Sequence, residues 1–374
     1  MDKHLHIVSF TVPYPVVHGG IADLFYKIVA LHDAGIIIHL HCFSENDNRP
    51  EELNKYCASV NYYPRRKGLA GFSFTVPYIV SSRKSKQLVN NLLKDNHPVL
   101  LEGVHSTWLM NDPRLASRKI CLRLHNIEYI YYRQLRHSTT SLFKKIYYNF
   151  ESKLLKKYEY RIARKFTCIF TVSQLDKFNY KKKLHTRNCI FVPVFTEHSS
   201  VNALPGKGEY CLYHGNLSVP ENETAVFWLI DKVFSHLDIN LIVAGRNASP
   251  ALIKKINSHV NTSIVSNPSD VKMNELVHNA QCHVIPSFNA TGVKLKLINA
   301  LYNGRHCITN KACAEGSELE DLCIIANNAL AFTDTVKKFY EIPFTTEDVV
   351  RRGMALKSVF NTRENVERLI RRLW

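Results

Sequence analysis

Short apolar segments alternate with amphipathic segments along almost the whole chain, and this alternation restricts the fold more than any other feature. Strand-like runs at 4–11, 36–43 and 98–103 are separated by helix-like segments such as 21–33. After a polar stretch, the alternation starts again near residue 209. Strands that alternate with helices in this way form parallel sheets with helices on both faces. We therefore expect an α/β protein with two doubly wound parallel sheets.

Chain length agrees with two domains. The chain has 374 residues, which is more than one ordinary hydrophobic core holds. Pro205, Gly206 and Gly208 mark a polar linker between the two runs of alternation. The expected divisions are an N-terminal Rossmann-like domain at 1–195, a linker at 196–208, a C-terminal Rossmann-like domain at 209–355 and a helical segment at 356–374, with a cleft between the two domains.

Two segments in the first half are less regular. Residues 62–78 contain prolines, glycines and a basic trio and are expected to form a loop. Residues 81–96 have helical spacing and are expected to form one helix. Residues 119–124 form a further expected strand, which leads directly to His125.

Composition favours a protein of the cytoplasm. Hydrophobic residues make up 45% and charged residues 22% of the chain, and no segment is long enough to cross a bilayer. The opening MDKHLHIVSF enters a strand without the apolar core of a signal peptide. The ten cysteines form no C-x-x-C pair, which favours reduced core residues over disulfides or zinc ligands.

The formal charge of +17 indicates an anionic partner: nucleic acid, an acidic membrane surface or a phosphorylated substrate. Ten basic residues lie between 133 and 165, interleaved with aromatic and aliphatic residues at helical spacing. This spacing predicts a long amphipathic helical region with a basic face. A solvated helix is the simpler interpretation. Docking on anionic lipid is the more specific interpretation, since each basic residue near the membrane surface contributes about 1 kcal/mol of binding free energy.

The stretch from 283 to 310, HVIPSFNATGVKLKLINALYNGRHCITN, reads as strand, loop, helix and strand. Thr291 and Gly292 are expected at the helix entrance, where free backbone N–H groups attract an anion. Lys294 and Lys296 add positive charge there, although cations are unfavourable at the start of a helix. A bound phosphate would remove this conflict. One more βαβ unit with solvated lysines is the simpler interpretation.

Glycines and a histidine mark other ends of the expected strands. Gly19 and Gly20 lie where the first strand leads into the first helix, so their backbone is able to approach a phosphate or a sugar. A tight turn explains the same pair. His125 ends its strand within HNIE and is expected to face the ligand crevice of a doubly wound sheet. No G-x-G-x-x-G dinucleotide fingerprint is present.

These motifs resemble those of family 4 glycosyltransferases, retaining enzymes of GT-B architecture within glycosyl transferases group 1. The resemblance spans nearly the whole chain in architecture and is specific at four places. These are Gly19 with Gly20, His125 in HNIE, Gly215, and the stretch from Thr291 to Asn299. The resemblance implies that His125 contacts the transferred sugar, that the C-terminal domain binds the nucleotide sugar and that a final helix at 364–374 crosses back to the first domain.

The chain departs from the family pattern at the donor site. The family usually has an arginine and a lysine after the first strand of the second domain, where this chain has Asn216 and Asn222. Thr291 and Asn299 replace the two glutamates of the family's Glu-x7-Glu motif. The remaining candidates to neutralise a diphosphate are Lys294, Lys296 and Arg246. Because no D-x-D motif is present, we expect side chains and helix N-termini to take the place of a metal.

The resemblance implies a retaining transferase that moves a sugar from a nucleoside diphosphate sugar to a polysaccharide or lipid-linked glycan. The expected setting is the synthesis of bacterial surface glycans such as lipopolysaccharide, in the cytoplasm and peripherally at the inner membrane face, without a cofactor or nucleic acid. Three alternatives stay open. They are an inactive GT-B scaffold, a basic nucleic-acid-binding protein, and a sugar-nucleotide 2-epimerase that uses Glu102, His105, His125 and Glu128.

Overall fold

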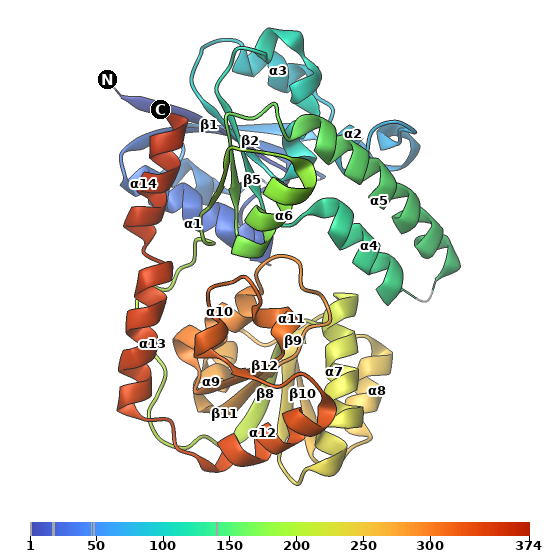
Figure 1. Cartoon of the computed structure of the whole chain (residues 1–374), viewed down its shortest axis with the longest axis vertical. Helices are drawn as coiled ribbons and strands as arrows, with labels where there is room; N and C mark the ends of the chain where they lie inside the picture. The colour runs from blue at the N-terminus through green and yellow to red at the C-terminus, as the bar shows by residue number, and fades with distance from the viewer. Residues whose placement is uncertain (1, 17–18, 46, 48, 140) are drawn as a thin grey trace. The chain divides into compact units, whose positions relative to one another are not determined.

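The chain divides into two compact units, each built on one parallel sheet flanked by helices. The computed structural model describes residues 2–16, 19–45, 47, 49–139 and 141–374 (Figure 1). Unit 1 consists of Met1–Glu197 and Phe360–Trp374, and unit 2 consists of His198–Val359. No described helix combines the length and the apolar character that a membrane span requires.

Unit 1 contains a seven-stranded sheet in the order β3-β2-β1-β4-β5-β6-β7, and every pairing is parallel. Its strands are β1 (Lys3–Ser9), β2 (Ile36–Ser44), β3 (Ser59–Pro64), β4 (Val99–Glu102), β5 (Ile120–Leu124), β6 (Cys168–Thr171) and β7 (Cys189–Phe191). Strands β4, β5 and β6 are buried along their whole length. Burial of this kind is typical of parallel sheets that helices cover on both faces.

The helices of unit 1 begin at identifiable caps. They are α1 (Gly19–Asp33), α2 (Tyr78–Ser81), α3 (Lys86–Leu92), α4 (Glu128–Ser138), α5 (Leu142–Ile162), α6 (Gln174–Leu184) and α14 (Thr362–Leu373). The side chains of Ser85, Ser141 and Ser173 accept backbone N–H groups at the starts of α3, α5 and α6. Helices α4 and α5 pack side by side (Figure 1).

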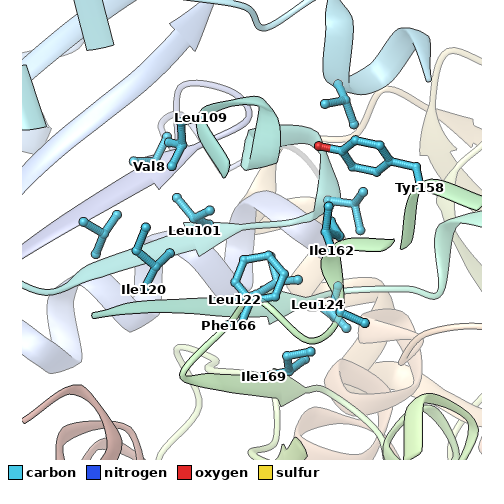
Figure 2. Close-up of a cluster of buried hydrophobic side chains, with 14 of the residues drawn as sticks. Val8, Leu101, Leu109, Ile120, Leu122, Leu124, Tyr158, Ile162, Phe166 and Ile169 are labelled. Atoms are coloured by element: carbon cyan, nitrogen blue, oxygen red, sulfur yellow. The ribbon is translucent and has the colours of Figure 1, made fainter. Parts of the chain in front are cut away.

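The core of unit 1 lies on both faces of the sheet. On one face, Leu101, Leu122 and Ile169 pack against Tyr158 and Ile162 of α5 (Figure 2). A second buried cluster contains strand residues together with Leu24 and Ile28 of α1 and with Val366, Leu369 and Leu373 of α14. The last helix of the chain is therefore part of unit 1, where it lies beside α1 (Figure 1).

Unit 2 contains a six-stranded parallel sheet in the order β10-β9-β8-β11-β12-β13. Its strands are β8 (Tyr210–Asn216), β9 (Leu241–Arg246), β10 (Thr262–Ser266), β11 (Ala280–Ile285), β12 (His306–Thr309) and β13 (Ile324–Ile325). Its helices are α7 (Pro220–Lys232), α8 (Pro250–Asn257), α9 (Asp270–Asn279), α10 (Leu295–Asn303), α11 (Lys311–Ala314), α12 (Ala329–Glu341) and α13 (Thr346–Val359). Ser249 and Ser269 cap α8 and α9.

The expected α/β class with two doubly wound parallel sheets is confirmed, but two local expectations are wrong. The segment 62–78 is not all loop, because β3 extends to Pro64 and α2 begins at Tyr78. The helix expected at 81–96 reduces to α3, since Ser85 starts it by capping. The basic region at 133–165 is helical as expected, and it is divided into two helices, because Ser141 caps a new helix after α4 ends at Ser138.

Candidate active site

Each sheet reverses its strand order at one point, and many of the residues selected from the sequence lie near these points. The order reverses between β1 and β4 in unit 1 and between β8 and β11 in unit 2. In doubly wound sheets, ligands bind outside the carboxyl ends of the strands at such a point. Each unit therefore has its own candidate ligand-binding edge.

In unit 1, His125 follows β5 directly and lies against two carboxylates. Its Nε2 is 3.1 Å from Oε2 of Glu102, at the end of β4, and its Nδ1 is 3.6 Å from Oδ2 of Asp23, in α1. The side chain of His125 is 14% exposed, whereas both carboxylates are buried. The two carboxylates thus orient an imidazole that stays partly accessible.

Two buried cations neutralise these carboxylates. Lys27 Nζ lies 3.2 Å from Oδ2 of Asp23 and 2.9 Å from an oxygen of Glu102. Arg123 donates from Nε and Nη2 to Asp23, at 3.2 and 2.8 Å. Burial alone would raise the pKa of Asp23, but Arg123 and Lys27 hold it well below its usual range. We call Asp23, Lys27, Glu102, Arg123 and His125 the acid–histidine cluster.

The acid–histidine cluster also contains ligand types that suit a metal ion. One ligand atom each from Asp23, Glu102 and His125 lies within 4.8 Å of the others. The ammonium of Lys27 already lies within 3.2 Å of both carboxylates, and Arg123 adds a second positive charge. A divalent ion would have to displace a cation that is buried in the same place. The residues present therefore fit an internally neutral cluster better than a metal centre.

Gly19 and Gly20 are the first two residues of α1. The first N–H groups of a helix have no intrahelical partner and are available to an anion. A Cβ on Gly20 would meet the Phe10 ring at an ordinary contact of 3.7 Å. Phe10 packs edge-on against His125, with ring centroids 5.8 Å apart. Gly20, Phe10 and His125 therefore lie along the same edge of the sheet.

In unit 2, the carboxyl ends of β8 and β9 run in register, with Gly215 opposite Gly245 and Asn216 opposite Arg246. A Cβ on Gly245 would lie 1.9 Å from the carbonyl oxygen of Gly215, so this close approach requires glycine. The side chain of Arg246 is about half exposed, and its Nη2 lies 3.4 Å from Oδ1 of Asp270. Arg246 is thus beside the candidate edge, but its guanidinium pairs with α9.

Lys296 of α10 extends to Asn222. Its Nζ donates to Oδ1 of Asn222 and to the hydroxyl of Tyr213, both at 2.7 Å, and lies 4.6 Å from the Tyr213 ring centroid. Desolvation lowers the pKa of Lys296 to about 8. A Cβ on Gly215 would lie 3.8 Å from Cδ of Lys296. We call Tyr213, Gly215, Asn222 and Lys296 the lysine cluster.

Side-chain hydrogen bonds hold the loop between β11 and α10. Oδ1 of Asn289 accepts from N and Oγ1 of Thr291, at 2.8 and 2.7 Å. Lys294 Nζ donates to the carbonyl of Thr291 at 2.8 Å and lies 3.5 Å from Oε1 of Glu221, in the first turn of α7. Lys294 is therefore near the lysine cluster in sequence, but the carboxylate of Glu221 already pairs with its ammonium.

Helix α10 begins later than the sequence predicts. It starts at Leu295, so Thr291 and Gly292 lie in the preceding loop, and the prediction that they form the helix entrance is wrong. Val293 continues the helical spacing of apolar residues, which made the helix look longer. The φ angle of Gly292 is +65°, a conformation that favours glycine and does not continue a right-handed helix.

Asn299 faces β8 from the side of α10. Its Nδ2 is 3.5 Å from Nε2 of His214, and its Oδ1 accepts from Nδ2 of Asn303 at 2.7 Å. Burial lowers the pKa of His214 to about 4, so this imidazole is neutral at physiological pH. Asn299 thus belongs to an uncharged hydrogen-bonded group within unit 2.

The sequence reasoning missed several members of both clusters. Asp23 and Lys27 are four residues apart in an otherwise apolar helix, and Arg123 interrupts a buried strand. Charges in such positions indicate buried pairs, so this signal was available. Tyr213 offered none, because a tyrosine within an apolar strand reads as an ordinary core residue. Of the four epimerase candidates, Glu102 and His125 are the two that belong to the acid–histidine cluster.

Part of unit 2 matches a known family model. Residues 208–341 match the family model described as glycosyl transferases group 1. The chain is also similar to an uncharacterised 44.6 kDa protein in the cps region of Klebsiella pneumoniae. The two sequences are 26% identical over 406 residues, which cover 95% of this chain and 97% of the relative.

Two solved structures resemble the whole chain in fold. One is a variant of TarM from S. aureus in complex with fondaparinux, α-GlcNAc-glycerol and UDP, with a TM-score of 0.72, 10% identity and 99% coverage of both chains. The other is HepE from Anabaena in complex with UDP, with a TM-score of 0.62, 11% identity and 99% coverage of both chains. The GT-B fold expected from the sequence is thereby confirmed.

Proposed function

Unit 2 contains a glycosyl transferases group 1 domain, and on that premise we propose that the chain is a retaining glycosyltransferase of cell-surface glycan synthesis. Its donor would be a nucleoside diphosphate sugar and its acceptor a polysaccharide or a lipid-linked glycan. The cps-region relative supports this setting, and the UDP bound in the two solved structures supports this donor class.

The position of Lys296 is the observation that best supports the proposal. Its ammonium lies at the strand-order reversal of unit 2, where nucleotides bind in doubly wound sheets. A leaving diphosphate needs positive charge near it, and a desolvated ammonium interacts more strongly than a solvated one. Lys296 would stabilise the diphosphate, with Gly215 allowing the backbone to approach it.

The chemistry would need no protein nucleophile. The bond between the anomeric carbon and the diphosphate breaks while the acceptor oxygen bonds to the same face of that carbon. The departing phosphate takes the proton of the acceptor hydroxyl. His125, held by Glu102, would orient the sugar. Because Lys27 and Arg123 neutralise the acid–histidine cluster, transfer is proposed to proceed without a metal.

A thermal-shift screen of the full chain tests the donor class. UDP, GDP, ADP, CMP and their common sugar conjugates are compared with and without a chelator. We expect one nucleoside diphosphate to raise the melting temperature, and the shift to survive the chelator. No shift with any nucleotide would reject the transferase, and a shift that the chelator removes would reject metal independence.

The exposed part of α5 supports a peripheral membrane role. Leu142, Phe143 and Ile146 in its first turns are 69%, 87% and 62% exposed. Lys144 and Lys145 lie among them and are also exposed. Apolar side chains that enter the interface beside cations are typical of helices that bind anionic lipid. The chain would reach a lipid-linked acceptor by binding the membrane through this part of α5.

Flotation with lipid vesicles tests this role. We expect the chain to float with vesicles that contain one quarter phosphatidylglycerol and to stay unbound with pure phosphatidylcholine. Replacing Lys144 and Lys145 by glutamine should weaken binding about 30-fold, at about 1 kcal/mol per cation. Phe143→Ser should weaken it too, whereas Phe178→Ser, which alters an exposed phenyl ring of α6, should not. Equal binding to both vesicles, or a preference for RNA, would contradict the proposal.

A further inference from the structure

A pocket of about 280 Å³ lies in unit 1 beyond the carboxyl ends of β1 and β2. Its walls combine aromatic rings with charged groups. The residues that matter for its chemistry are Phe10, Tyr14, Phe43, Glu45, Arg65 and Arg83. The flat rings suit the C–H faces of a sugar, and the two arginines suit an acid.

Arg83 is a buried cation with unused donors. Arg83 as a whole is only 6% exposed. Nε donates to the carbonyl of Phe10 at 2.9 Å, and Nη1 donates to the carbonyl of Ile79 at 2.7 Å and to Oγ of Ser82 at 3.4 Å. Nη2 has no hydrogen-bond partner among the described residues. These three acceptors are uncharged, so they leave the positive charge of Arg83 unneutralised.

The nearby carboxyl groups do not neutralise Arg83 either. Glu45 pairs with Arg65 and with Lys67. Burial and the neighbouring Glu159 raise the pKa of Glu128 to about 8, so Glu128 is mostly protonated at neutral pH. Burial lowers the pKa of Arg83 to about 9, and its guanidinium therefore stays charged at that pH. An anionic ligand would relieve the cost of this buried charge.

Arg65 gives the pocket a second group with an unused donor. Its Nε is buried and lacks a partner among the described residues, although its Nη1 pairs with Glu45. Phe10 forms a wall of the pocket and packs against His125, with ring centroids 5.8 Å apart. A ligand in the pocket would therefore lie one aromatic ring away from the acid–histidine cluster.

We propose that this pocket binds an acidic group of the acceptor, a carboxylate or a phosphate, through Arg83 and Arg65, so that the acceptor is an anionic glycan. The inference rests on the proposed transferase function, because only then is a sugar bound beside His125 an acceptor. The planar guanidinium of Arg83 offers the two N–H groups of Nη2 to the anion.

Saturation-transfer NMR on the full chain tests the inference. The probes are glucuronic acid, glucose 6-phosphate and uncharged glucose, with inorganic phosphate as a competitor. Because charge-assisted hydrogen bonds contribute about 1.5–3 kcal/mol, we expect one acidic sugar to bind at least about tenfold more tightly than glucose. Preference for glucuronic acid indicates a carboxylate. Preference for glucose 6-phosphate, with competition by phosphate, indicates a phosphate. Equal binding of all three sugars would overturn the inference.

Variants separate recognition from folding. Arg83→Gln should abolish the preference for the acid, and Arg65→Gln should reduce it without altering the hydrogen bonds of Arg83. Arg118→Gln is the control, because the Arg118 side chain is only 4% exposed and also donates to main-chain carbonyls, those of His97 and Asp95, although it pairs with the Asp95 carboxylate as well. It should leave the preference intact. A preference that survives both Arg83→Gln and Arg65→Gln would overturn the inference.

The nucleotide screen separates this inference from the proposed function. A nucleotide shift together with equal binding of acidic and neutral sugars would reject the anionic acceptor alone. Preference for an acidic sugar without any nucleotide shift would reject the transferase and, with it, the acceptor role of the pocket.

Discussion

Asp23→Asn is expected to destabilise unit 1 by about 3–5 kcal/mol, the usual cost of removing one partner from a buried ion pair. Asp23 accepts from both Nε and Nη2 of Arg123, from Nζ of Lys27 and from the backbone N–H of Phe195. Asparagine preserves the shape but removes the charge. Lys27 would then have only Glu102 as an anionic partner, and Arg123 would keep only the carbonyls of Val192 and Pro193.

Chemical denaturation measures this loss of unfolding free energy, and hydrogen exchange of the folded chain shows where in the chain it occurs. Peptides from β5 and α1 should exchange faster in the variant, while peptides from unit 2 should be unchanged. Asp231→Asn is the matched control, since Asp231 pairs with Lys255 where both side chains are substantially exposed. That change should cost at most about 1 kcal/mol. Equal losses in the two variants would show that the acid–histidine cluster contributes no more than a surface pair.

The same cluster should make unit 1 sensitive to acid. The pKa of Asp23 is depressed in the folded chain, since Arg123 and Lys27 outweigh the opposing effect of burial, and that of Glu102 is lowered too, mainly by Lys27. A carboxyl with a depressed pKa contributes stability above its unfolded pKa of about 4, and this contribution is lost as the pH falls below that value. Asp23→Asn should therefore be less sensitive to pH in this range than the natural chain.

The sequence predicted the sheets well because most of their strands are short runs dominated by apolar residues. Apolar residues on both faces dominate β4, β5 and β6, in spite of Glu102 and Arg123, so their burial could be inferred without knowing their neighbours. β3 was missed because SVNYYP is an edge strand with mixed side chains and a terminal proline. The apolar pattern alone does not set the start of α10 at Leu295, and the backbone conformation of Gly292 decides it.

The candidate site was predicted only in part, because it depends on pairings between distant segments. His125 was selected from its place after a strand, which the fold preserves. Its link to Asp23 joins residues about 100 positions apart, and no local pattern encodes such a contact. Arg246 was chosen as a basic residue at the end of a strand, but its direction toward Asp270 depends on the packing of α9.

Lys296→Met is expected to lower the turnover of the donor sugar about 100-fold, which is typical when one group that stabilises a developing anion is removed. Methionine keeps the length and the apolar contacts of the lysine stem. Binding of the nucleoside diphosphate selected by the thermal-shift screen should weaken as well. Lys272→Met is the control, because Lys272 lies exposed on α9 and pairs with Glu275. Unchanged turnover in Lys296→Met would exclude this lysine from donor binding.

The pH dependence gives a second and independent measure. Desolvation lowers the pKa of Lys296 to about 8, so the free chain loses this charge as the pH rises through that value. Affinity for the diphosphate should therefore fall between about pH 7.5 and 9.5, and Lys296→Met should flatten this profile. A profile that stays unchanged in the variant would assign the titration to another group.

This result would also explain why two asparagines are tolerated at the family's basic positions. β8 and β11 are neighbours in the sheet, so the segments that follow them reach the same point from different parts of the chain. Asn222, which follows β8, accepts a hydrogen bond from Lys296, which follows β11. Positive charge supplied from either segment can act on the same phosphate, because electrostatic stabilisation depends on where the charge lies and not on which strand carries it. Asn222→Ala keeps the ammonium of Lys296 but removes the Oδ1 that accepts from Lys296 and Tyr213 and the Nδ2 that donates to the carbonyl of Asn216. It should then weaken donor binding less than Lys296→Met does.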